Sequence, residues 1–380
     1  MAKGRHLLPS SVQPLWKAAH RANSAGFAPH PGRMFLIPAN DFALRRKRCE
    51  TLLPRLLQLP REFVSVCNLC SSPHNAIVAA RDRYGLPLRT AMCLNCGLVY
   101  LMDRFTSAGY SRFYNEGFYR EISSLYLGVR HSIAQVRSNQ THYADKLIQA
   151  IRGYVNGGPD CRLLDIGGSA GVVALEFVKQ FGIEATVLEP SAEESAAARE
   201  SGLQAITGSL EEWTPRDKFQ IVLLCRSVEH VFDLRHSLKK IRDLLAPGGL
   251  FYCDIADFWE LSRITGAAET VTKADHCYWF SHDTLPAIFR SAGFEVVSMN
   301  VVFSQAQVGF LLRAGEPRPV EPMSQRQISA KLMDLCHIER AWQEAASTDQ
   351  GWSDQLRGKA YRIKRKVLKT MNHRNSLSPR

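Results

Sequence analysis

The segment from residue 162 to 189 constrains the fold of this 380-residue chain more than any other. A short apolar run reaches Asp165, and a turn of very small residues, Gly167–Gly171, follows it. An amphipathic stretch to about Phe181 then leads to a second apolar run that ends at Glu189. Small residues let a backbone approach a ligand closely, and a carboxylate at the end of the next strand can accept both ribose hydroxyls. The pattern predicts a strand–loop–helix–strand unit built around a nucleotide-like ligand.

The spacing of the glycines separates two kinds of nucleotide ligand. A dinucleotide dehydrogenase carries Gly-x-Gly-x-x-Gly and lays the pyrophosphate on a helix N-terminus. Here the glycines are Gly167, Gly168 and Gly171, and Asp165 stands just before them. A carboxylate at that point would repel a diphosphate and attract an ammonium group. These residues therefore disfavour a nicotinamide-dependent oxidoreductase, which stays open as an alternative.

Further landmarks follow in chain order. The segment 207–213 comes after a short strand and offers residues to frame an adenine ring. An apolar run without alternation, 219–225, is typical of a buried parallel strand. A helical stretch, 233–245, then stops at Ala-Pro-Gly-Gly, residues 246–249. The candidate cofactor-binding residues are Asp165, Gly167, Gly168, Gly171, Glu189, Ser209, Leu210 and Arg226.

In this ordered set, residues 140–315 resemble the class I S-adenosylmethionine-dependent methyltransferases. The matching pieces are Asp165–Gly171, Glu189, Val228–Val231 and Leu245–Gly249. The resemblance implies S-adenosylmethionine as cofactor and an α/β fold with a Rossmann-like seven-stranded sheet. One departure is Ser169, which stands where such loops usually have their middle glycine. The expected strands are 162–166, 185–189, 204–206, 219–225, 249–255, 294–302 and 307–313, the last two as an antiparallel edge hairpin.

Two C-x2-C pairs, Cys67/Cys70 and Cys93/Cys96, precede this region. Four thiolates on two tight turns suit tetrahedral zinc, and four protein ligands make such a site structural. Two disulfides or four unrelated buried thiols are the alternatives. We expect a hairpin between the pairs, with its turn at residues 84–87.

A four-cysteine ribbon before such a core resembles bacterial methyltransferases of sugar, polysaccharide and secondary-metabolite pathways. In that group, aromatic and basic segments similar to Tyr110–Tyr114 and Phe118–Arg120 bridge the ribbon and the core and help to close the cofactor pocket.

A carbon or hydroxyl acceptor must lose a proton, so a base is expected near the transferred methyl group. The candidate catalytic residues are His276, His230 and Tyr278. Sugar C-methyltransferases commonly have His-Glu-His in the corresponding loop, and His276 matches the last position, while Ala274 replaces the first histidine. We expect His276 to be the base, and His230 and Tyr278 to shape the acceptor pocket. A solvated loop histidine is the alternative for His276.

The net charge of +12 is spread unevenly along the chain. Residues 1–61 and 355–380 each carry +9, which leaves −6 on residues 62–354. An acidic body argues against nucleic acid as a partner. The sequence shows no apolar run long enough to span a membrane and no signal-peptide pattern, so we expect a cytoplasmic protein. The basic helical end could make a peripheral contact with anionic lipid at the inner face of the membrane.

The expected organisation has five parts. They are a basic extension with a disordered start, 1–61; a zinc ribbon, 62–104; a helical linker or lid, 105–155; the methyltransferase domain, 156–315; and a linker with a basic helical C-terminal extension, 316–380. The leading hypothesis is methyl transfer from S-adenosylmethionine to a small-molecule or glycan acceptor. A zinc-ribbon RNA methyltransferase and a non-catalytic zinc-ribbon binding protein with a degenerate core are the alternatives.

Overall fold

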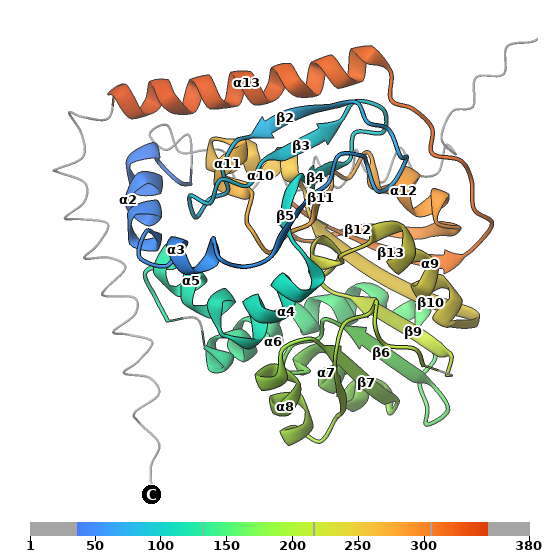
Figure 1. The fold of residues 1–380 in the computed structure, drawn as a ribbon. Helices are drawn as coiled ribbons and strands as arrows, with labels where there is room; N and C mark the ends of the chain where they lie inside the picture. Colours follow the sequence, from blue (N-terminus) through green and yellow to red (C-terminus); the bar gives the residue numbers. More distant parts are fainter. Residues whose placement is uncertain (1–35, 131, 216, 305, 349–380) are drawn as a thin grey trace, which may run out of the picture.

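A seven-stranded sheet forms the centre of the computed structural model, which describes residues 36–130, 132–215, 217–304 and 306–348 (Figure 1). The strand order is β12-β13-β10-β9-β6-β7-β8. Six strands run in the same direction, and β13 runs antiparallel to them between β10 and β12. The strands are β6 (Arg162–Ile166), β7 (Glu184–Glu189), β8 (Gln204–Thr207), β9 (Phe219–Leu224), β10 (Leu245–Ala256), β12 (Phe294–Ser304) and β13 (Gln307–Ala314). The predicted Rossmann-like sheet with its edge hairpin is confirmed.

Helices cover both faces of this sheet, which explains why its central strands are apolar without alternation. In β6, Leu163 packs with Phe177 and Leu147 on one face, while Leu164 joins Ile241 and Phe289 in the core of the other. The helices of the first face are α6 (Ile133–Ile151), α7 (Val172–Phe181) and α8 (Ala192–Glu200), and those of the second are α9 (Leu234–Leu244) and α12 (Leu285–Ser291).

A smaller four-stranded sheet, here called the ribbon sheet, lies against the central one (Figure 1). Its order is β11-β4-β3-β2, with β2 (Asn75–Ala79), β3 (Thr90–Cys93), β4 (Val99–Leu101) and β11 (Tyr278–Trp279). The predicted hairpin between the cysteine pairs is β2–β3, in which Asn75 faces Cys93. A separate two-stranded sheet pairs β1 (Arg61–Phe63) with β5 (Asp103–Phe105). β11 follows β10 of the central sheet in the chain, yet it pairs with β4 of the ribbon. The ribbon sheet therefore contains strands from both regions of the chain, and the sequence analysis did not predict this.

The remaining helices surround the ribbon sheet and form a second core with it. They are α2 (Ala39–Cys49), α3 (Leu53–Leu56), α4 (Ser107–Asn115), α5 (Phe118–Leu127), α10 (Phe258–Thr265), α11 (Ala268–Val271) and α13 (Gln325–Thr348), with short 3-10 turns η1 (Arg152–Tyr154) and η2 (Val228–His230). The basic extension thus contributes two helices, α2 and α3, and Pro54 lies in the first turn of α3.

Three predictions fall wholly or largely outside the described residues: the disordered start of the basic extension, the basic helical end of the chain, and membrane contact through that end. Among the helices that are described, we find none that has both the length and the apolar composition that a membrane crossing requires.

Trp342 fixes α13 against the rest of the molecule. Its indole Nε1 donates to Ile37 O at 2.7 Å, and its ring meets that of Phe42 edge to face at 5.6 Å. The Trp342→Ala variant should lower the free energy of unfolding by about 3 kcal/mol, because a large buried ring leaves a cavity. Chemical denaturation measures this. Met333→Ala, on the exposed side of the same helix, should change it by less than about 0.5 kcal/mol, and equal effects would contradict the assignment.

Candidate active site

The loop between β6 and α7 is packed so closely that a side chain would clash at Gly167 and Gly168. A Cβ atom on Gly167 would lie 2.6 Å from Ser227 Oγ, and one on Gly168 would lie 2.6 Å from Asp165 Oδ2. Gly167, Ser169 and Gly171 have φ angles of +68°, +54° and +75°, in the left-handed region. Ser169 therefore holds the conformation that a glycine would adopt more easily. The run of small residues is required by this geometry.

Glu189 binds this loop directly. Its Oε2 accepts the Ser169 N–H at 2.9 Å, and its Oε1 accepts the Ser191 N–H at 2.8 Å. The predicted convergence of the loop and the carboxylate is therefore present. Burial, with a smaller contribution from nearby Glu194, raises the pKa of Glu189 to about 8. The hydroxyl groups of a bound ligand would share these two oxygens with the N–H groups of Ser169 and Ser191.

Asp165 is the other carboxylate at this edge of the sheet. It is 1% exposed, and neither of its oxygens has a hydrogen-bond partner of good geometry among the described residues. Burial raises the pKa of Asp165 to about 7. An unpartnered buried carboxylate is costly, and a cationic group beside it would remove that cost. The two carboxylates and the tight loop fit a ligand with an ammonium group and vicinal hydroxyls.

The remaining predicted cofactor residues stand close to this point in different ways. Gly208 N–H donates to Glu189 O at 3.1 Å, which brings the segment 208–210 beside the carboxylate. Within that segment Ser209 Oγ accepts the Glu212 N–H, and Leu210 is buried in the core. Arg226 follows β9, but its guanidinium lies over the Tyr143 ring at 4.7 Å. Contact of Ser209, Leu210 or Arg226 with a cofactor stays a prediction.

The two candidate histidines lie together beyond the strand ends. Their ring centroids are 4.6 Å apart, edge to face. His230 Nδ1 is 2.8 Å from Asp275 O and 3.1 Å from Tyr114 Oη. Because a carbonyl oxygen only accepts, Nδ1 carries the proton and Nε2 keeps its lone pair. Burial lowers the pKa of His230 to about 4, so the ring is neutral at pH 7.

His276 differs from His230 in its hydrogen bonding. Its Nδ1 is buried without a partner among the described residues, and its ring lies 5.8 Å from that of Trp279. Burial, followed by the nearby Lys273 cation, holds the pKa of His276 well below its usual value. Burial alone would raise the pKa of Asp275, but Lys273, whose Nζ is 3.0 Å from Oδ2, holds it below its usual value. Both histidines are therefore neutral, beside a buried ion pair.

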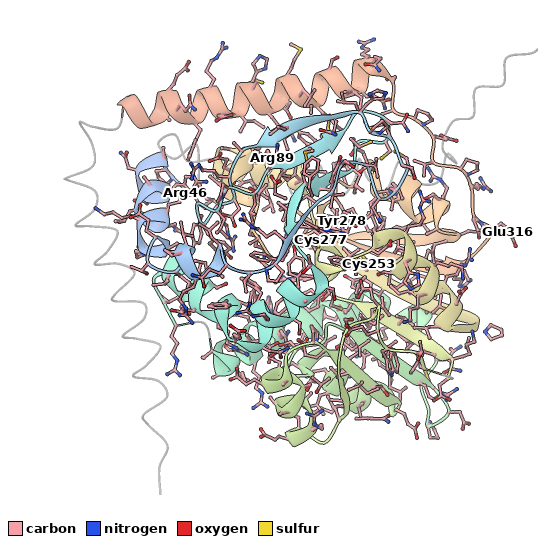
Figure 2. The ribbon with its side chains drawn as sticks, viewed as in Figure 1. Arg46, Arg89, Cys253, Cys277, Tyr278 and Glu316 are labelled. Atoms are coloured by element: carbon pink, nitrogen blue, oxygen red, sulfur yellow. The ribbon has the colours of Figure 1, made fainter. Side chains whose placement is uncertain are left out.

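Tyr278 has a structural contact in this arrangement. Its ring is 2% exposed, and its hydroxyl donates to Phe232 O at 3.1 Å. Cys277 and Tyr278 lie where the ribbon sheet meets the central sheet (Figure 2). Tyr278 thus joins β11 to the segment after His230, and its catalytic role stays a prediction.

Helices α4 and α5 supply contacts near the histidines and near Glu189 that the sequence analysis did not predict. Tyr114 of α4 contacts His230, as described above. Arg120 of α5 pairs with Glu194 at 2.6 Å and with Glu193 at 3.1 Å, at the start of α8. These ion pairs join α5 to the first turn of α8, which follows Glu189 in the chain. The aromatic and basic residues of these segments are visible in the sequence. The sequence did not show which residues they contact in the folded protein.

The four paired cysteines form a compact cluster within the ribbon. Cys67 Sγ is 3.6 Å from Cys96 Sγ, and Cys70 Sγ is 3.5 Å from Cys93 Sγ. All four sulfurs lie within 4.8 Å of one another. Disulfide sulfurs would be about 2 Å apart, whereas tetrahedral zinc with bonds of about 2.3 Å separates its sulfurs by about 3.8 Å. The cluster excludes the disulfide alternative and fits a four-coordinate metal.

The two cysteine turns share one backbone pattern. Cys67 N–H donates to Ser72 O, and Cys93 N–H donates to Leu98 O. The residues after the second cysteines, Ser71 and Gly97, both have positive φ angles, +61° and +75°. The repeated turn explains how two separate C-x2-C pairs direct their sulfurs to one point.

Comparison with known proteins agrees with this geometry. Residues 136–299 match the family model described as "Methyltransferase domain". The matched residues hold the glycine loop and the strand-end acid, and with the end of β12 and all of β13 they complete the seven-stranded sheet of a class I S-adenosylmethionine-dependent methyltransferase domain.

Individual relatives match only part of the chain. A "Ubiquinone biosynthesis O-methyltransferase" from Bradyrhizobium sp. (strain ORS 278) is 39% identical over 95 residues, 23% of this chain and 37% of that protein. One of the same name from Bradyrhizobium diazoefficiens is 35% identical over 95 residues, again 23% of this chain and 37% of that protein. The chain thus spans little more than a third of the length of these relatives.

Solved structures match the chain at low similarity. A possible histamine N-methyltransferase from Thermotoga maritima has a TM-score of 0.38 and 22% identity, over 47% of this chain and 94% of that one. A complex of the Haloferax volcanii Trm112 activator and a methyltransferase gives a TM-score of 0.41 and 16% identity, over 48% and 95%.

The raised pKa of Asp165 predicts a pH-dependent stability difference. In the folded state its protonated form is favoured, so this contribution is complete below about pH 4 and is lost as the pH rises through about 7. Asp165→Asn cannot ionise. Its melting temperature relative to wild type should therefore rise between pH 5 and pH 8, by at least about 2 °C. Scanning calorimetry without ligand measures this. The exposed Asp217→Asn variant is the control, and a constant difference for Asp165→Asn would contradict the shift.

Proposed function

We propose that this chain transfers a methyl group from S-adenosylmethionine to a hydroxyl group of a small-molecule acceptor. The observation that carries the proposal is the loop hydrogen bond from Ser169 N–H to Glu189, with the unpartnered carboxylate of Asp165 beside it. Asp165 would hold the ammonium group of the donor, and Glu189 would accept its ribose hydroxyls. The small residues of the loop leave the backbone open to the ligand.

The chemistry on the acceptor side rests on His230. When bound, S-adenosylmethionine supplies an electrophilic methyl carbon and a neutral thioether as leaving group. The acceptor oxygen forms the new bond as the carbon–sulfur bond breaks, and its proton must go to a base. His230 Nε2 has the free lone pair, because Asp275 O holds Nδ1–H. His276 and Tyr114 would line the acceptor position beside it.

Two features support a small hydroxyl acceptor within the broader class. Tyr114 contacts His230 and its ring packs against that of Tyr119, and aromatic rings at this position favour a compact, partly apolar molecule. The curated relatives are named for O-methylation in ubiquinone biosynthesis. Glycan and RNA acceptors belong to the same test as alternative outcomes.

Binding and transfer assays test this function. The protein should bind S-adenosylhomocysteine but not NAD in calorimetry, and should transfer labelled methyl from S-adenosylmethionine to members of a phenol panel. Label that appears only in glycans or RNA would contradict a small-molecule acceptor and assign the acceptor to that class instead. Absence of S-adenosylhomocysteine binding would overturn the proposal and favour a non-catalytic binding protein.

The two histidines should differ in their contributions. His230→Ala should lower kcat by about 100-fold or more, because it removes the base, while His276→Ala should lower it by about tenfold. Both should leave the Kd of S-adenosylhomocysteine within about twofold. With the pKa of His230 lowered to about 4, wild-type kcat/KM should show no histidine limb between pH 6 and pH 8. A larger loss for His276→Ala would assign the base to His276 instead.

We also propose that the four-cysteine cluster holds one structural zinc ion. Four sulfur ligands at tetrahedral spacing leave no open coordination position for substrate. Protein prepared without chelator should contain about one equivalent of zinc by mass spectrometry of metals. Cys96→Ala should lose it, whereas Cys336→Ala, an exposed cysteine elsewhere, should keep it. Less than half an equivalent in wild type would contradict the proposal.

A further inference from the structure

The tip of the ribbon hairpin is organised by one buried carboxylate. Asp82 is 0% exposed, and its Oδ1 accepts the N–H groups of Tyr84 at 3.0 Å and Leu86 at 2.9 Å. These bonds close the turn between β2 and β3. Its other oxygen, Oδ2, reaches out of the hairpin and accepts the Ala274 N–H at 3.0 Å. Asp82 therefore joins the ribbon to a residue 192 positions later in the chain.

Ala274 is held from a second direction by the lid. Its carbonyl oxygen accepts the hydroxyl of Tyr110, from α4, at 3.0 Å. The neighbouring Thr272 O accepts the Arg83 N–H at 2.8 Å. Ala274 is 0% exposed, so no solvent can replace these partners. The backbone of 272–274 is thus clamped between the ribbon hairpin and the lid.

The clamped segment leads directly into the histidine pair. Asp275, whose carbonyl orients His230, and His276 are the next two residues. On their far side Cys277 is also held, since Cys277 N–H donates to Glu229 O and Leu101 N–H donates to Cys277 O. A displacement of Ala274 would move the carbonyl that selects the tautomer of His230.

We propose that Asp82 is a positioning residue for the histidine pair: the zinc ribbon, through Asp82 Oδ2 and the Ala274 N–H, sets the place of Asp275 O and so the orientation of His230. The kinetic part of this inference rests on the proposed methyl transfer. The structural part does not, because it concerns only where the segment 272–277 is held.

Asp82→Asn tests the contact selectively. Asparagine keeps one acceptor oxygen for the hairpin turn but places an amide NH2 group against the Ala274 N–H. Hydrogen-exchange mass spectrometry of the full-length protein should show at least tenfold faster exchange in peptides covering 272–277. Peptides of the loop 165–171 should be unchanged. The matched control is Asp103→Asn, a ribbon carboxylate that pairs with Arg89 at 2.6 Å and does not reach the segment 272–277.

Kinetics give a second readout that a general loss of stability would not produce. With an acceptor identified, Asp82→Asn should lower kcat at least tenfold, with the Kd of S-adenosylhomocysteine within twofold and the zinc content unchanged. The pH profile should change with it, because a released His230 is more exposed to solvent and its pKa should rise toward its usual value.

A milder variant serves if Asp82→Asn does not fold. Tyr110→Phe removes only the hydroxyl on the other side of Ala274, and should raise exchange of the same peptides by at least threefold. Unchanged exchange at 272–277 in a folded Asp82→Asn protein, or in Tyr110→Phe, would overturn the inference. If wild type transfers no methyl group, the exchange result still decides it.

Discussion

The hydrogen bond from Ser169 N–H to Glu189 joins the carboxyl ends of two neighbouring parallel strands, and the rest of the site is arranged around it. It requires the tight left-handed turn at 167–171, which in turn requires residues that leave room for Asp165 and Ser227. The same bond places a buried acid on each side of the loop. Burial disfavours the charged form of both acids and raises their pKa values. A ligand with a cationic group and hydroxyl donors would stabilise the charged forms.

A second dependence links the ribbon to the methyltransferase domain. β11 belongs to the loop that bears His276, yet it pairs with β4 in the ribbon sheet. Further bonds join the first cysteine turn to the start of α9, where Arg235 N–H donates to Asn68 Oδ1. These contacts attach the ribbon, with its four-cysteine cluster, to β11 and to the start of α9.

Local pattern was sufficient for the central sheet. The central strands β6 and β9 are short apolar runs, and glycine or proline follows β6, β7 and β8. Burial on both faces of the sheet makes the apolar signal of the central strands strong. The edge hairpin, β12 and β13, was expected from the resemblance to methyltransferases, and the two strands do pair antiparallel. The cysteine cluster was predictable for a different reason. The C-x2-C spacing determines the turn within each pair, and the cluster then needs only one long-range contact between the two turns.

The acceptor side was not predictable in the same way. Which nitrogen of His230 keeps its lone pair depends on Asp275 O and Tyr114, which lie 45 and 116 residues away in the chain. The pairing of β11 with β4 spans an even longer stretch of chain, since Tyr278 pairs with Tyr100. The two residues of β11 carry no strand signal of their own. The sequence by itself determined the sheet, the glycine loop, the strand-end acid and the cysteine turns, because each is specified by neighbours along the chain. Only the tertiary structure decided the tautomer, the clamp on Ala274 and the shared sheet, because these depend on contacts between segments that meet only after folding.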